Sequence, residues 1–116
     1  MRILFVGDRS IRNDAIIKVI ESKTDRDIQQ ITFDELHSQD ERYLFLILDL
    51  LDNSRSFEDC IRIIKGENIS DFLVAIYDGS SNLNEQSLKE AGADYCFSLD
   101  SDPRELVNII SEVNGT

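Results

Sequence analysis

The sequence contains little proline, glycine, cysteine or positive charge. Its 116 residues include one Pro and five Gly, which argues against a long linker or a disordered tail. The two cysteines, Cys60 and Cys96, form no CxxC motif and have no histidine cluster near them in sequence, so neither a disulfide framework nor a zinc site is indicated. Each lies among apolar residues and is expected to fill space in the core. At this length a chain can bury a stable core without staples.

Basic residues are outnumbered almost two to one. Twelve Lys and Arg stand against 23 Asp and Glu, which gives a formal net charge of −11. This balance disfavours nucleic-acid binding by the chain, because phosphate contacts require a basic face. An acidic surface instead suits cationic partners or divalent metals. The apolar stretch in the N-terminal MRILFVG is too short for a signal peptide or a membrane span, so we expect a cytoplasmic protein without membrane insertion.

Short apolar runs predict the strands of a parallel sheet. The runs are apolar almost throughout rather than alternating, which is typical of strands covered on both faces. A weaker run is expected to form an edge strand. The four clear runs are Ile3 to Val6, Leu44 to Leu48, Phe72 to Tyr77 and Tyr95 to Leu99, and the weaker one is Ile28 to Thr32.

Apolar residues at helical spacing lie between these runs. Asp102, Pro103 and Glu105 mark the start of the C-terminal helix, and Asn82 with Glu85 marks the start of the helix before Gly92. A short second helix is expected around residues 33–37. The other expected faces are Ile11, Ala15, Ile16, Val19 and Ile20 after the first strand; Phe57, Cys60, Ile61 and Ile64 after the third; and Leu106, Ile109, Ile110 and Val113 near the C-terminus.

The order of elements is strand–helix repeated five times. This alternation predicts an α/β fold of the flavodoxin-like (βα)5 type, a doubly wound parallel sheet with strand order 2-1-3-4-5. The whole chain, 1–116, is expected to form a single domain. Its polar end, Asn114-Gly115-Thr116, fits either a natural end or a boundary before another domain.

Acidic residues gather where the predicted strands end. Asp8 follows the first strand and Asp49 ends the third, and these two strands are neighbours in the predicted order. In such sheets ligands bind at the carboxyl ends of the strands, near this switch point. Two carboxylates there would suit Mg²⁺, although an Asp at a strand end also often caps the next helix.

Four segments, RILFVGD, YLFLILDL, AGADY and DPREL, occur in an order and at separations that resemble the receiver domain of two-component response regulators over nearly the whole chain. The resemblance implies that a pair of acids after strand 1 holds Mg²⁺ and that an Asp after strand 3 accepts a phosphoryl group. It also implies a Thr or Ser after strand 4 that senses the phosphoryl group, and a Lys after strand 5 that pairs with it.

The acceptor position is retained and the metal position is half retained. The phosphoacceptor falls on Asp49, and the acid pair falls on Gly7 and Asp8, so one acid is missing. A metal would then be held by Asp8 and Asp49, with the Leu51 carbonyl as a further ligand.

The switch positions are changed. The small hydroxyl residue is replaced by Tyr77, and the lysine by Leu99. The aromatic residue of the last strand is replaced by Cys96, with Tyr95 beside it as a candidate substitute. Because Leu99 removes a positive charge that would offset the incoming phosphoryl group, transfer to Asp49 is expected to be weak or absent.

The leading hypothesis is therefore a degenerate receiver, a pseudo-receiver without enzymatic activity that regulates an attached or separate effector such as a transcription factor. The expected partners are a histidine kinase, another protein or a second copy, docking on the face made by the helix before Gly92, the last strand and the C-terminal helix. One alternative is a functional phosphoacceptor that uses Asp49 with Mg²⁺. Another is a small-molecule-binding flavodoxin-like domain, although the first loop, GDRSIRND, lacks a glycine-rich phosphate cradle.

Overall fold

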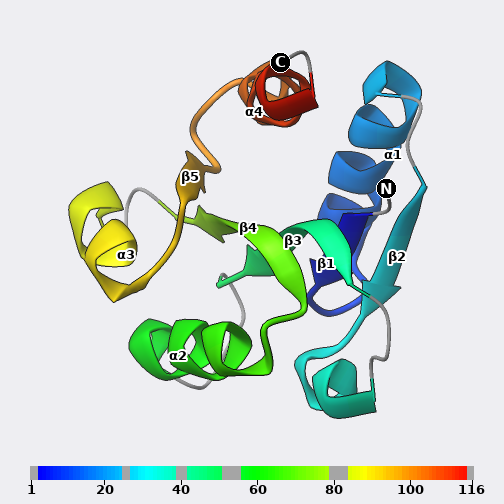
Figure 1. Cartoon of the computed structure of the whole chain (residues 1–116). Coiled ribbons are helices and arrows are strands. Elements are labelled where there is room, and N and C mark those ends of the chain that lie inside the picture. The colour runs from blue at the N-terminus through cyan, green and yellow to red at the C-terminus, as the bar shows by residue number, and fades with distance from the viewer. Residues whose placement is uncertain (1–2, 25–26, 39–41, 51–55, 79–83, 115–116) are drawn as a thin grey trace.

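The computed structural model of the chain describes residues 3–24, 27–38, 42–50, 56–78 and 84–114, without the side chains of 37–38 and 113–114. Within these ranges strands and helices alternate along the chain (Figure 1). In chain order the elements are β1 (Ile3–Val6), α1 (Ile11–Thr24), β2 (Ile28–Ile31), the 3₁₀ helix η1 (Phe33–Ser38), β3 (Tyr43–Asp49), α2 (Phe57–Glu67), β4 (Ser70–Tyr77), α3 (Glu85–Ala91), β5 (Tyr95–Ser98) and α4 (Pro103–Asn114).

The strands form one parallel sheet in the order β2-β1-β3-β4-β5. This confirms the predicted doubly wound topology. Helices α1 and α4 cover one face of the sheet, and α2 and α3 cover the other (Figure 1). Strand order reverses between β1 and β3, so the carboxyl ends of these two strands form the edge where such folds bind ligands.

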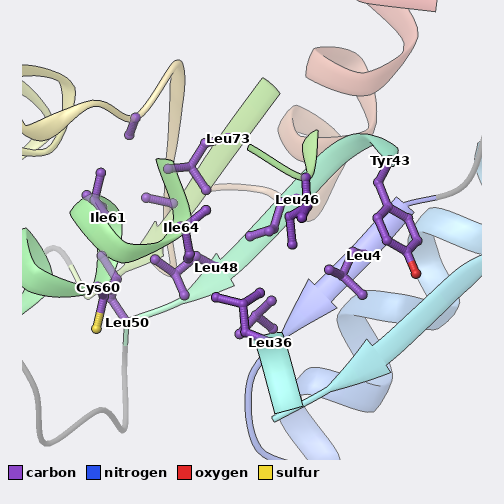
Figure 2. Close-up of a cluster of buried hydrophobic side chains, with 14 of the residues drawn as sticks. Leu4, Leu36, Tyr43, Leu46, Leu48, Leu50, Cys60, Ile61, Ile64 and Leu73 are labelled. Carbon is purple, nitrogen blue, oxygen red and sulfur yellow. The ribbon is translucent and has the colours of Figure 1, made fainter. Parts of the chain in front are cut away.

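Two hydrophobic clusters lie on the two faces of the sheet. In β1, Leu4 and Val6 join the cluster under α2 and α3, whereas Ile3 and Phe5 join the one under α1 and α4. Figure 2 shows the first cluster, in which Ile61 and Ile64 of α2 pack toward the leucines of the sheet. Burial on both faces explains why the central strands are apolar without alternation.

The second predicted helix is the one element that takes a different form. Residues 33–38 form a 3₁₀ helix whose Leu36 is buried in the first cluster. Phe33, three residues earlier, is partly buried against the same cluster. Residues at i and i+3 lie on one face of a 3₁₀ helix, and such helices are common as short connectors. The weak strand at residues 28–31 is an edge strand as predicted, and it pairs with β1.

The predicted inner face of α1 was wrong at its N-terminal end. Ile11 is 90% exposed and Ala15 is exposed, while Asn13 is fully buried. The buried stripe is Asn13, Ile16 and Ile20, at positions i, i+3 and i+7. Hydrogen bonds from the Asn13 side chain to the sheet edge set this rotation, so a polar residue takes the place that the apolar pattern assigned to Ile11.

Polar side chains cap the helices. Ser10 accepts a hydrogen bond from the Asn13 backbone N–H, and Ser56 accepts one from that of Asp59. The cap of α3 is Asn84, which accepts from the Ser87 N–H, and not the predicted Asn82, which lies outside the described residues. None of the helices in the described ranges is both long and apolar enough to cross a membrane.

Candidate functional site

The candidate site lies where β1 and β3 end side by side. The register pairs Val6 with Leu48, which places Gly7 next to Asp49. The Gly7 N–H donates to the carbonyl of Ile31, and the Leu50 N–H donates to that of Ile76, so the sheet bonding continues past the strand ends. Asp49 is thereby held on a rigid edge, with its side chain on the α1 side of the sheet.

The carboxylate of Asp49 is buried and contacts the first turn of α1. Its side chain is 2% exposed. Asn13 Nδ2 donates a hydrogen bond of 2.9 Å to Asp49 Oδ2, and Arg12 Nη2 lies 3.5 Å from the same oxygen as an ion pair. Removing a carboxylate from water costs several kcal/mol, about 3–5 kcal/mol when it is left without a partner, so these two donors make the burial of Asp49 tolerable.

The backbone carbonyl of Asp8 takes part in the same site, at the edge where β1 and β3 end. Asn13 Nδ2 donates to the Asp8 carbonyl at 2.8 Å, and Gln30 Nε2 donates to it at 3.1 Å. One amide nitrogen of Asn13 thus bridges the ends of β1 and β3. The residue Asp8 itself is exposed, and its described contacts with Asn13 and Gln30 are made by its carbonyl and not by its carboxylate.

Gly7 is required by a close approach of the two strands. A Cβ built on Gly7 would lie 2.7 Å from Asp49 Cβ and 3.1 Å from Asp49 Oδ2. A side chain here would collide with the acceptor-like carboxylate. Residue 7, where the expected pair would have its other acid, therefore has no room for an acidic side chain in the present backbone.

The described donors fit a divalent metal poorly. Mg²⁺ takes one or two carboxylates plus waters in near-octahedral geometry. Gly7 supplies no carboxylate, Asp8 is exposed, and Asp49 Oδ2 already accepts from Asn13. No cluster of three or more His, Cys, Asp or Glu side chains suited to a metal occurs in the described part of the chain. The Leu51 carbonyl lies outside that part, and metal binding by Asp8 and Asp49 stays a prediction.

Tyr77 lies on the opposite face of the sheet from Asp49. It packs against the cluster under α2 and α3. Burial raises the pKa of its phenol, and the carboxylate of Glu85 acts in the same direction. Tyr77 is thus directed toward α3, and it does not take the place of a small hydroxyl group beside Asp49.

Leu99 and Cys96 are the other two switch positions at which the sequence departs from the receiver pattern. The Leu99 N–H donates to the Tyr77 carbonyl at 3.0 Å, and its side chain packs against the cluster under α1 and α4. The Cys96 thiol lies on the α3 side, 3.8 Å from the Glu85 carbonyl. Burial raises the pKa of this thiol to about 11, so it is protonated at neutral pH.

Tyr95 does not substitute for the aromatic residue replaced by Cys96. It lies on the other face, in an aromatic cluster with Phe45 and Phe72, with ring centroids 6.5 and 6.1 Å from its own. Neighbouring residues of a strand point to opposite faces, so a one-residue shift would have to turn the strand over.

The sequence reasoning missed Arg12, Asn13 and Gln30. They are polar residues outside the resemblance, and apolar periodicity does not detect them. A signal was present in the spacing of Asn13, Ile16, Ile17 and Ile20, which is a complete i, i+3, i+4, i+7 stripe once a polar residue is allowed in it.

Solved structures of receiver domains share this fold. The receiver domain of a DNA-binding response regulator protein (merR) from Colwellia psychrerythraea superposes with a TM-score of 0.76 at 21% identity, covering 100% of this chain and 99% of that one. The BeF3-activated DrrB receiver domain gives 0.75 at 19% identity, over 99% and 97% of the two chains. The chemotaxis protein CheY4 of Vibrio cholerae gives 0.74 at 15% identity, over 97% and 98%.

The sequence itself matches no protein-family model and no curated protein. At these identities the structural matches establish the fold, a receiver-type (βα)5 domain. They extend over nearly the full length of both chains.

Proposed function

We propose that this chain is a receiver-like signalling and interaction module that works without appreciable phosphorylation of Asp49. The observation that carries the proposal is the Asp49 carboxylate, which stands at the switch-point end of β3 yet is buried and bonded to Asn13 and Arg12. The module is proposed to be cytoplasmic and non-enzymatic, and to control a transcriptional or other effector.

The proposed loss of phosphorylation follows from the charges around Asp49. A phosphoryl group carries about −1.5 to −2 charge at pH 7. Its transfer depends on positioning and on cations that offset the charge. Leu99 supplies none, Gly7 removes one metal ligand, and one of the two carboxylate oxygens, Asp49 Oδ2, accepts a hydrogen bond from α1. A phosphoryl group transferred to Oδ2 would have to displace Asn13, and transfer to either oxygen would bury further negative charge.

A phosphodonor assay tests this proposal. The protein is incubated with Mg²⁺ and acetyl phosphate and its intact mass is measured, beside Asp49→Asn as the control. We expect no species heavier by one phosphoryl group, about 80 Da. A stoichiometric heavier species that the Asp49→Asn variant lacks would overturn the proposal and establish the alternative, a functional phosphoacceptor.

The small-molecule alternative is tested separately. A flavin or cobalamin would colour the purified protein. We expect a colourless protein whose ultraviolet absorption is that of its tyrosines. A bound chromophore released by denaturation would favour the alternative.

The proposed docking face for a protein partner or a second copy consists of α3, β5 and α4. A shallow hollow of about 450 Å³ on it is lined by Glu85, Gln86, Lys89 and Glu90. Lys89 pairs with Glu85 at 3.1 Å, and Arg104 pairs with Asp102 at 2.7 Å. A protein that docks on this face, such as a histidine kinase, would have to replace these exposed ion pairs with contacts of its own. Each pair contributes about 0–1 kcal/mol.

A further inference from the structure

Asp49 has a cation next to it that comes from its own chain. Arg12 Nη2 lies 3.5 Å from Asp49 Oδ2, and the Arg12 side chain is 35% exposed. The guanidinium therefore reaches the buried carboxylate from the protein surface. A guanidinium stays protonated at every pH a protein survives, so this positive charge is permanent.

The position of Arg12 is fixed by its neighbour in the helix. Asn13, the next residue, is buried and bonded to both Asp49 and the Asp8 carbonyl. The Ser10 cap fixes the same turn through the Asn13 N–H. The first turn of α1 is thus attached to the ends of β1 and β3, and Arg12 is held beside Asp49 by backbone that cannot easily move away.

From this arrangement we infer that Arg12 is the resident cation of the Asp49 carboxylate and excludes a divalent metal from this corner of the sheet. The inference rests on the proposed function, because it concerns the same carboxylate. A metal ion at Asp49 would be brought close to the guanidinium, and like charges at such distances repel strongly where water is scarce. The carboxylate is neutralised whether or not Mg²⁺ is present.

Removing the guanidinium should allow a metal ion to bind at Asp49. The variant Arg12→Gln removes the guanidinium that lies beside Asp49 Oδ2, at the edge of the sheet where the exposed Asp8 follows β1. Carboxylates, carbonyls and waters are the ligands that Mn²⁺ and Mg²⁺ prefer. Metal affinity is thus expected to be low in the wild type and higher in this variant.

Mn²⁺ titration followed by electron paramagnetic resonance measures this directly, on the full chain. We expect Arg12→Gln to bind one Mn²⁺ at least about tenfold more tightly than the wild type, and Arg12→Lys to stay close to the wild type. Arg9→Gln is the matched control, since it removes the same charge from an exposed residue. The charge of Arg9 lowers the pKa of Glu35. Equal affinities of Arg12→Gln and Arg9→Gln would contradict the inference.

A second comparison needs no change at Arg12. The wild type and Asp49→Asn are expected to bind Mn²⁺ equally weakly, because the wild-type carboxylate is already paired. Mn²⁺ binding by the wild type that disappears in Asp49→Asn would overturn the inference even if Arg12→Gln failed to fold. Metal binding and phosphoryl transfer are measured separately, so a wild type that excludes metal but accepts a phosphoryl group would refute the proposed function alone.

Discussion

Asn13 is the residue on which the candidate site depends most. Its side-chain amide donates to the Asp49 carboxylate at 2.9 Å and to the Asp8 carbonyl at 2.8 Å, inside a fully buried environment. Hydrogen bonds to charged groups contribute about 1.5–3 kcal/mol, and a buried charge that loses its partner costs more. Asn13 therefore holds the ends of β1 and β3 together, a role that the sequence does not predict for a polar helix residue.

Replacing Asn13 with Ala is expected to lower the free energy of unfolding by about 2–4 kcal/mol, because Asp49 loses its shortest described donor. Urea denaturation followed by circular dichroism measures the loss. The matched control is Asn108→Ala, an exposed Asn of α4, with an expected change within about 0.5 kcal/mol. In an Asp49→Asn background the cost of Asn13→Ala should fall by about 1 kcal/mol or more. Identical costs in both backgrounds would show that the two residues are not coupled.

At the scale of elements, α3 is held less firmly than α2. It has seven residues and buries Leu88 alone, whereas α2 has eleven and buries Cys60, Ile61 and Ile64. A short helix with one buried side chain relies on its ends. The ends of α3 are well made, with the Asn84 side chain at its start and Gly92, at φ 132°, at its close.

The cap of α3 is expected to control the opening of that helix separately from α2. Asn84→Ala should raise amide exchange in residues 85–91 about fivefold, equivalent to about 1 kcal/mol, and leave residues 57–67 unchanged. Hydrogen–deuterium exchange with mass spectrometry measures both segments at once. Ser56→Ala, at the cap of α2, should show the reverse pattern. Equal acceleration of both helices by either variant would mean that they open as one unit.

Sequence patterns predicted the elements better than the site. The buried strands β3 and β4 were recognisable because both of their faces are covered, so their sequences are continuously apolar. The 3₁₀ form of residues 33–38 was not, because two apolar residues three apart, Phe33 and Leu36, fit either helix type. Asp49 was found from its place at a strand end. Arg12 and Asn13 were not, because their role arises from a rotation of α1 that tertiary hydrogen bonds impose and apolar periodicity does not report.

At the scale of the whole molecule, excess negative charge opposes the compact state. The net charge is −11, and exposed pairs such as Arg42–Asp71 (2.8 Å) and Lys65–Asp94 (3.4 Å) offset it only locally. Such exposed pairs contribute about 0–1 kcal/mol each. Repulsion among the remaining acids is therefore expected to outweigh them.

Salt is expected to stabilise the protein. Raising NaCl from 10 to 150 mM shortens the screening length from about 30 to about 8 Å, which weakens repulsion between distant acids more than attraction within contact pairs. The melting temperature should rise, and differential scanning fluorimetry measures it. A MgCl₂ series at matched ionic strength should give the same rise, since the wild type is proposed to hold no metal at Asp49. A fall in melting temperature with NaCl would show that the ion pairs outweigh the repulsion.

The close contact at Gly7 also gives direction to any attempt to evolve phosphoryl transfer in this domain. With Asp49 Cβ only 2.7 Å from where a Gly7 Cβ would sit, restoring an acid at residue 7 has to wait until the ends of β1 and β3 have moved apart. Substitutions of Arg12 meet no such steric clash with Asp49, so they could come first. The substitutions are therefore epistatic: the same acid at residue 7 would be harmful early in a laboratory lineage and useful late in it, and selection would reach it only along one order of mutations.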